Sequence, residues 1–130
     1  MPRPADNIRV VLVRAQNAAN IGQTARAMKN FGVRKLTLVR CSPHRVPEAR
    51  TTGWKARDIL DRARIADNLE AVLRSASFSV GFTCRSGKHR GEVMSFREVL
   101  PRLFETAREK PVHLVFGNEK NGLSNEELSA

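Results

Sequence analysis

Four apolar runs rich in β-branched residues set the pattern of this chain. They occupy residues 8–13, 35–39, 78–82 and 112–116, and a shorter candidate lies at 64–66. Runs of this length that lack strict alternation are typical of strands buried on both faces of a parallel sheet. Stretches with helical spacing lie between them, so the pattern predicts an α/β fold in which helices cover both faces of a parallel sheet.

A helix is predicted soon after the first run. Asn20 has the character of its N-cap, and Gln23 three residues later completes a capping box. The apolar positions at helical spacing are Ile21, Ala25, Met28 and Phe31. These positions form one face directed at the core, Gly32 ends the helix, and Arg26 lies roughly opposite the core face.

The next stretch, residues 40–52, is rich in proline and arginine and is interpreted as a surface loop that carries Arg45. Trp54 then opens a helical stretch that reaches about residue 60. Its indole ring could stack on a nucleic-acid base. A lone tryptophan is more often part of the core, however, and we favour the core by about two to one.

Three further helix starts are marked by Ser or Asp followed by Glu three residues later, the pattern of a capping box. They are Asp67 with Glu70, Ser95 with Glu98, and Ser124 with Glu127. The second helix is expected to reach residue 108, with an apolar side made of Leu103, Phe104 and Ala107. The third has room for only about six residues, which is marginal in water and exposes Leu128, so we expect the chain to be cut short here.

Length, charge and cysteine content narrow the possible functions. At 130 residues the chain is expected to form one small domain. A net charge of +10 and a pI near 11 predict a polyanionic partner, above all nucleic acid, with a merely soluble basic protein as the alternative. No signal peptide or membrane-spanning run is visible, which favours the cytoplasm. The two cysteines, Cys41 and Cys84, are too few for a disulfide framework or a metal site and are interpreted as reduced thiols.

Two glycine-bearing loops follow the last two long runs, where the carboxyl ends of parallel strands form a ligand crevice. The loop at residues 117–124 has the glycine and serine spacing of a phosphate-binding loop, but Leu123 occupies the place of the required lysine, which argues against nucleoside triphosphates. A plain strand-to-helix connection is the alternative. The loop at residues 83–91 contains Lys88 and Arg90, and phosphate contact and a solvated surface are equally good interpretations of it.

The segments NIGQTAR (residues 20–26) and LVFGNEKNGLS (114–124) together resemble the first two motifs of the SpoU/TrmH family of SPOUT RNA methyltransferases. The neighbouring ARAMKNFGV and LSNEEL are most similar to the TrmJ branch of that family. The resemblance runs from Asn7 onward. It implies a trefoil-knotted α/β fold, S-adenosylmethionine as the methyl donor, a homodimer, and methylation of the ribose 2′-hydroxyl of RNA, with transfer RNA as the expected substrate.

The resemblance also assigns roles to individual residues. Arg26 would contact the target ribose and phosphate and assist removal of the hydroxyl proton, Asn20 would position Arg26, and Glu119 would organise the active site. Backbone groups around the cofactor are expected at Thr83, Cys84, Arg85 and Gly117. The residues expected to bind RNA are Arg26, Arg45, Lys88 and Arg90, and no metal is expected.

One part of the family pattern has no counterpart in this sequence. Family members continue past the second motif with a strand, a third motif and a final helix, which complete the knot and one wall of the cofactor pocket. We therefore expect residues 1–130 to be a methyltransferase domain truncated after its second motif. A non-catalytic RNA-binding module is the alternative. A dinucleotide-binding oxidoreductase is disfavoured, because no G-x-G-x-x-G follows any predicted strand.

Overall fold

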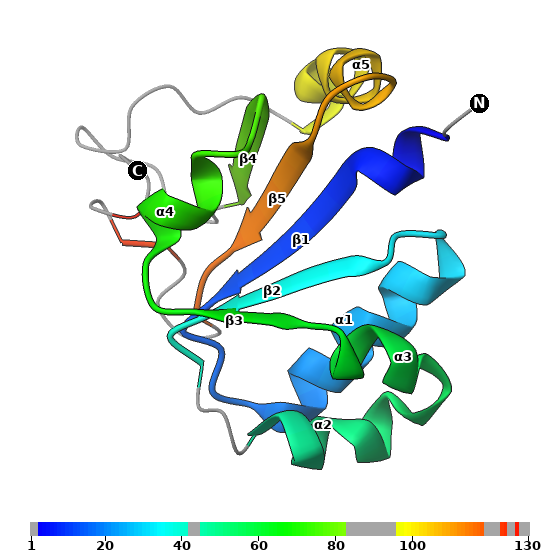
Figure 1. Cartoon of the computed structure of the whole chain (residues 1–130), viewed down its shortest axis with the longest axis vertical. Helices are drawn as coiled ribbons and strands as arrows, with labels where there is room; N and C mark the ends of the chain where they lie inside the picture. Colours follow the sequence, from blue (N-terminus) through cyan, green and yellow to red (C-terminus); the bar gives the residue numbers. More distant parts are fainter. Residues whose placement is uncertain (1–2, 42–44, 83–95, 119–122, 125–126, 128–130) are drawn as a thin grey trace.

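The computed structural model describes residues 3–41, 45–82, 96–118, 123–124 and 127. The strands within these ranges are β1 (Ile8–Val13), β2 (Lys35–Val39), β3 (Arg64–Ala66), β4 (Phe78–Phe82) and β5 (Val112–Phe116). They lie parallel in one sheet in the order β3-β2-β1-β5-β4 (Figure 1). All five coincide with the predicted runs, because β-branched residues fit the pleated, two-sided burial of a parallel strand.

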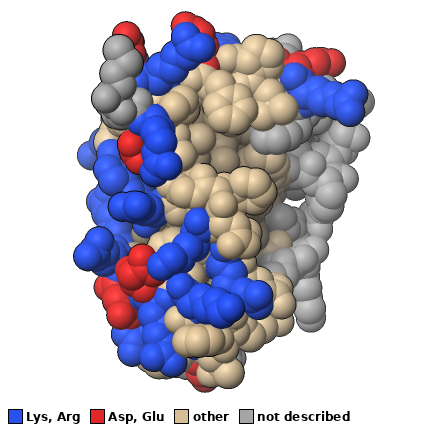
Figure 2. Space-filling model, turned by 90° about the vertical axis from the view of Figure 1, so that its right-hand side faces the viewer, with Lys and Arg blue, Asp and Glu red and all other residues tan. Residues whose placement is uncertain are grey.

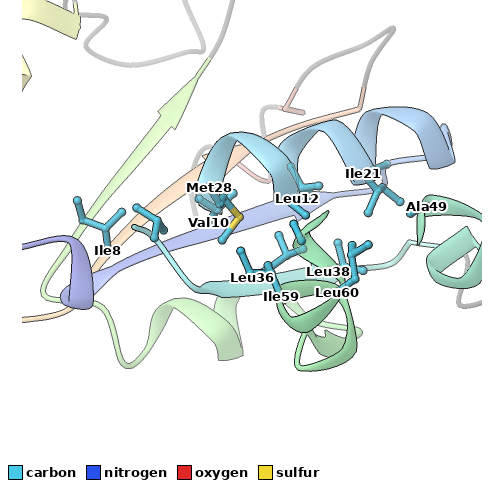
Figure 3. Close-up of a cluster of buried hydrophobic side chains, with 14 of the residues drawn as sticks. Ile8, Val10, Leu12, Ile21, Met28, Leu36, Leu38, Ala49, Ile59 and Leu60 are labelled. Atoms are coloured by element: carbon cyan, nitrogen blue, oxygen red, sulfur yellow. The ribbon is translucent and has the colours of Figure 1, made fainter. Parts of the chain in front are cut away.

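Helices lie on both sides of the sheet, as predicted. The helices of the described ranges are α1 (Ala18–Asn30), α2 (Arg45–Thr52), α3 (Arg57–Asp61), α4 (Leu69–Leu73) and α5 (Phe96–Ala107), with short 3₁₀ turns η1 (Pro4–Asn7) and η2 (Trp54–Ala56). The larger core joins α1, α2, α3 and α5 to one face of the sheet, and Figure 3 shows its centre between β1, β2 and these helices. A smaller core on the other face packs α4 against β1, β2 and β5 and includes Leu123.

The strand order places a topological switch point at the centre of the sheet. From β1 the chain moves outward through β2 to β3, crosses to β4 at the far edge, and returns through β5 to the other side of β1 (Figure 1). The chain therefore leaves β1 toward one edge of the sheet and enters β5 from the other edge, and open α/β sheets bind ligands at the carboxyl ends of strands at such a point. The trefoil knot stays a prediction, because the segments that the resemblance assigns to its closure have no counterpart among residues 1–130.

The start of α1 differs from the prediction that Asn20 caps it. The N-cap is Asn17, whose Oδ1 accepts hydrogen bonds from the backbone N–H groups of Ala19 at 2.9 Å and Asn20 at 3.3 Å. The helix begins earlier because Ala18 and Ala19 are strong helix formers and an equally good capping residue precedes them. Asn20 consequently lies in the first turn and is exposed.

The prediction of a surface loop over residues 40–52 is wrong for its second half, which forms the helix α2. Pro47 is the third residue of α2, in the first turn, where the backbone N–H groups have no acceptor within the helix, so proline is tolerated there. The side chain of Arg45, the first residue of α2, lies outside the described set. The helix packs tightly on α1: a Cβ added to Gly22 would lie 2.0 Å from Thr52 Oγ1 and 2.4 Å from the Ala49 carbonyl oxygen.

Two aromatic residues placed in the core by helical spacing are instead exposed. Phe31 is 80% exposed and Phe104 is 49% exposed, although Ile21, Ala25 and Met28 are buried as predicted. Phe31 is the C-cap of α1, outside the regular turns to which the spacing applies, and Gly32 follows with φ +75°.

The cap of α4 was predicted one residue too early. Asn68 Oδ1, not the Asp67 carboxylate, accepts the hydrogen bond from the Ala71 N–H at 3.1 Å. The Asp67 carbonyl oxygen instead accepts a hydrogen bond from Arg40 Nε at 2.9 Å, which ties Asp67 to the end of β2. The predicted cap of α5, Ser95, lies outside the described residues.

Candidate active site

The carboxyl ends of β1 and β5 are tied together directly. Arg14 follows β1 with φ +56°, a backbone conformation that is unusual for a residue with a side chain. Its N–H donates to the Val39 carbonyl oxygen at 2.8 Å, and its own carbonyl oxygen accepts from Asn118 Nδ2, also at 2.8 Å. These bonds hold the ends of β1, β2 and the loop after β5 at one edge of the sheet.

A bidentate ion pair closes the same edge. Arg14 Nε and Nη2 each donate to one carboxylate oxygen of Glu127 at 2.8 Å. The Ser124 N–H donates to Glu127 Oε1 at 2.7 Å, and the Glu127 N–H donates to Ser124 Oγ at 3.1 Å, so the predicted capping box at this position is confirmed. The hydrogen bonds from Arg14 lower the pKa of Glu127 to about 2, and the same pairing raises the pKa of Arg14.

Glu127 of this ion pair follows the second predicted motif, residues 114–124, by three residues. Gly117 lies at the edge and is half-buried, and the flat faces of Phe82 and Phe116 stack beside it with ring centroids 4.4 Å apart. Glu119, the motif residue expected to organise the active site, lies outside the described residues, as do the expected cofactor-binding residues Thr83, Cys84 and Arg85 and the RNA-binding residues Lys88 and Arg90.

Arg26 lies on α1, away from this edge. At 1.5 Å per residue its Cα is about 12 Å along the helix from Ala18. Its side chain is exposed, as predicted from the helical spacing. Asn20, six residues earlier, lies about 120° around the helix from Arg26, and its carbonyl oxygen accepts a hydrogen bond from Thr24 Oγ1 at 2.8 Å. The expected positioning of Arg26 by Asn20 stays a prediction.

Basic side chains gather on one side of the molecule. Figure 2 shows the side that lies at the right in Figure 1: lysine and arginine side chains line one edge and the lower part of this face, with several acidic side chains among them and an uncharged area at the centre. Within the ranges that the structure describes, no group of three or more His, Cys, Asp or Glu side chains is arranged to hold a metal ion. In those same ranges no helix has the length and apolar character needed to cross a membrane.

Two residues that build this edge, Arg14 and Glu127, were not predicted from the sequence as site residues. Arg14 and Glu127 are 113 positions apart, and neither sequence spacing nor periodicity links them. An arginine directly after a buried strand, combined with a capping-box glutamate at the end of the chain, was the available signal. Asn118 was part of the quoted motif, but its hydrogen bond to the end of β1 depends on the two strands being neighbours.

Comparison with known proteins agrees with this architecture. The profile of the SpoU rRNA Methylase family matches residues 7–130. The chain is 43% identical over 126 residues to the tRNA (cytidine/uridine/adenosine-2'-O-)-methyltransferase TrmJ of Pseudomonas aeruginosa, an alignment that covers 95% of this chain and 48% of that protein. It is 40% identical over 124 residues to the tRNA (cytidine/uridine-2'-O-)-methyltransferase TrmJ of Sodalis glossinidius, with 94% and 48% covered.

The chain thus spans about half the length of the curated relatives that it matches. Among solved structures, a methylase family protein from Neisseria gonorrhoeae superimposes with a TM-score of 0.87 at 32% identity, over 99% of this chain and 70% of that one. The family profile covers nearly the whole sequence, and the fold agrees with it. This chain belongs to the SpoU rRNA Methylase family.

Proposed function

We propose that this chain is the catalytic part of an RNA ribose 2′-O-methyltransferase that uses S-adenosylmethionine and acts on transfer RNA. Membership of the SpoU family, relatives named as tRNA 2′-O-methyltransferases, and the net charge of +10 support this function. The observation that carries it is an exposed arginine, Arg26, at the family's first motif on a helix that is fixed against its neighbours.

The chemistry of Arg26 follows from its guanidinium group. A guanidinium stays protonated at all ordinary pH values, so it is a poor base, but it presents five N–H donors in a rigid plane. Placed beside a ribose, it holds the phosphate and stabilises the negative charge that develops on the 2′-oxygen as the proton leaves. Attachment to α1 rather than to a loop keeps that geometry constant between turnovers.

We assign the methyl donor to the carboxyl edge of the sheet, formed by the ends of β1 and β5. The stacked rings of Phe82 and Phe116 offer aromatic contact area to an adenine ring, and Gly117 has no side chain to block an approach to the backbone. When bound there, S-adenosylmethionine supplies the electrophilic methyl group. The ion pair between Arg14 and Glu127 holds the edge rigid, and Glu119 completes the site according to the family resemblance.

A homodimer reconciles the two parts of the site. Arg26 lies about 12 Å along α1 from the helix start near the carboxyl edge, so we assign it to the cofactor site of a partner subunit. Each active site then combines the carboxyl edge of one copy with the α1 surface of the other. Sedimentation analysis that finds only monomers at catalytic concentrations contradicts this arrangement.

The function is tested by incubating the protein with unfractionated transfer RNA and isotopically labelled S-adenosylmethionine, then locating 2′-O-methylated nucleotides by mass spectrometry. Arg26→Ala is expected to lower turnover by about 100-fold, while RNA affinity falls little and its salt slope changes by about 1. The matched control is Arg34→Ala, which removes another exposed arginine shortly after α1 and is expected to keep turnover.

The alternative, a non-catalytic RNA-binding module, predicts different results in the same experiment. Such a module binds transfer RNA but transfers no methyl group, and calorimetry detects no S-adenosylmethionine binding. In that case Arg26→Ala and Arg34→Ala weaken RNA binding to the same small extent.

A further inference from the structure

The exposure of Trp54 contradicts the core role that we favoured from the sequence. The side chain is 58% exposed, although it lies in a tightly packed part of the fold. The preceding residue, Gly53, is buried against α1, where an added Cβ would lie 2.8 Å from the Gly22 carbonyl oxygen. The backbone beneath Trp54 is therefore fixed while its ring faces solvent.

The segment from Trp54 to Arg57 links two contacts with α1 that lie on either side of Arg26 along the helix. Gly22, Arg26 and Lys29 are spaced four and three residues apart, so they share one stripe of α1. Gly22 contacts Gly53 at one end of this stripe, and Lys29 Nζ lies 3.0 Å from Asp58 Oδ1 at the other. Residues 54–57 connect Gly53 to Asp58 and must pass along the part of the stripe that carries Arg26.

Positive charge surrounds the Trp54 ring. Lys55 Nζ lies 5.9 Å and Arg57 Cζ 6.0 Å from the ring centroid, the range of cation–π contacts. The nearby acidic residues are already engaged, since Asp58 pairs with Lys29 and Asp61 pairs with Arg50. An exposed aromatic ring on a fixed backbone, with two cations close to it, matches the way proteins bind single-stranded nucleic acid, in which bases stack and phosphates are neutralised.

We propose that Trp54 stacks on a base of the bound RNA next to the nucleotide whose ribose Arg26 contacts, while Lys55 and Arg57 hold the adjoining phosphates. This assignment rests on the proposed function and adds a stacking residue to it. The exposed indole then has a use that a structural role in the core does not provide. It also requires the target region of the RNA to be unpaired, because a base inside a duplex has no free face.

Intrinsic fluorescence tests the contact directly, because the chain contains one tryptophan and no tyrosine. Titration with unfractionated transfer RNA is expected to quench Trp54 emission. Heparin, a polyanion without bases, is expected to compete for the cations without the same quenching. RNA binding is measured independently by fluorescence anisotropy of end-labelled transfer RNA, so that binding and stacking are read separately.

Substitutions provide the second measurement. Trp54→Ala is expected to weaken RNA binding about tenfold, and Trp54→Phe is expected to retain most of the affinity, because a phenyl ring still stacks. Phe31→Ala is the matched control: it removes an even more exposed aromatic ring from the end of α1, on the opposite side of the helix from Gly22. It is expected to leave affinity unchanged.

Each remaining outcome is decisive. RNA that binds by anisotropy without quenching Trp54, or equal affinities for Trp54→Ala and Phe31→Ala, overturns the stacking assignment and leaves the proposed function intact. A change from dimer to monomer on Trp54→Ala in sedimentation also overturns it, in favour of a contact between protein subunits. If labelled transfer RNA does not bind the unsubstituted protein at all, the proposed function fails and the stacking assignment fails with it.

Discussion

Charged side chains behave differently in two regions of the molecule. At the carboxyl edge of the sheet, Arg14 and Glu127 form a bidentate pair, with side chains only 28% and 12% exposed. On the outer surface formed by α1, η2 and α3, cations such as Arg26, Lys55 and Arg57 remain exposed. Their acidic neighbours are bound to other basic residues, so this surface keeps a positive charge.

The contrast shows that residue type does not reveal the role of a charge. A partly buried arginine with a forked partner fixes the backbone, because separating the pair leaves a charge in a place that water reaches poorly. An exposed cation contributes little to folding but attracts a polyanion over several ångströms. The first kind of charge builds this site, and we assign the second kind to binding RNA.

The largest loss of stability is expected from a substitution that separates α1 from α2 beneath the outer surface. Gly22→Val forces a side chain into the space occupied by Thr52 and the Ala49 carbonyl oxygen, so α1 and α2 must separate. We expect the free energy of unfolding to fall by about 3 kcal/mol, measured by urea denaturation. Ala27→Val, at an exposed position of the same helix, should cost only about 0.5 kcal/mol. Equal losses for the two variants contradict the close packing of α1 on α2.

The ion pair at the carboxyl edge should rank second. Glu127→Gln removes the charge but keeps the shape, and we expect a loss of about 2 kcal/mol at pH 7. The folded-state pKa of Glu127 is lowered to about 2 from its ordinary value of 4.5. Its contribution is therefore fully present above pH 4.5 and is lost as the pH falls toward 2.

Urea denaturation across this pH range checks the assignment of the ion pair. The Glu127→Gln variant should lack the part of the pH dependence that lies between 4.5 and 2. Glu105→Gln is the matched control, because Glu105 and Arg108 are both well exposed and 3.8 Å apart. It should change stability by less than about 0.5 kcal/mol. A flat pH profile for the unsubstituted protein in this window rules out the structural role of Arg14 and Glu127.

His113 offers a smaller effect in a separate pH window. This side chain of β5 is 2% exposed, and burial, followed by the charges of Arg9 and Arg64, lowers its pKa from 6.5 to about 4. Folding favours the neutral form, so stability is complete above pH 6.5 and falls as the pH drops from 6.5 toward 4. His113→Gln should remove about 1 kcal/mol of this pH dependence. A measured His113 pKa above 6, from its ring proton shifts, contradicts the burial.

The smallest effect is expected for the ion pair between Lys29 and Asp58 on the outer surface. Both side chains are about half exposed, and the buried Ile59 and Leu60 hold α3 in place. Asp58→Asn should leave the thermal midpoint unchanged in a calorimetric scan. Added salt should have no further effect on the variant. If stability falls clearly instead, this exposed ion pair stabilises the fold as the pair at the carboxyl edge does, and the two regions do not differ.

Much of the fold follows from local sequence. The five strands appear where β-branched runs predicted them, and the capping box of Ser124 and Glu127 forms as expected. Two of the errors concern choices between nearby residues: Asn17 rather than Asn20 caps α1, and Asn68 rather than Asp67 caps α4. Nearby residues of similar capping ability differ by less free energy than the contacts that fix each turn, so sequence alone does not separate them.

Some features of the site were likewise predicted from the sequence, and others depend on the tertiary structure. The motif residues on α1 and at the end of β5 were predicted from sequence, since motif spacing is local. The strand order that brings the loop after β5 next to Arg14, the pairing of Arg14 with Glu127, and the exposure of Trp54 were decided by tertiary structure. Periodicity tells which side chains of one element point the same way. Which surface those side chains meet depends on the elements that folding brings next to them, as it brings the loop after β5 next to Arg14.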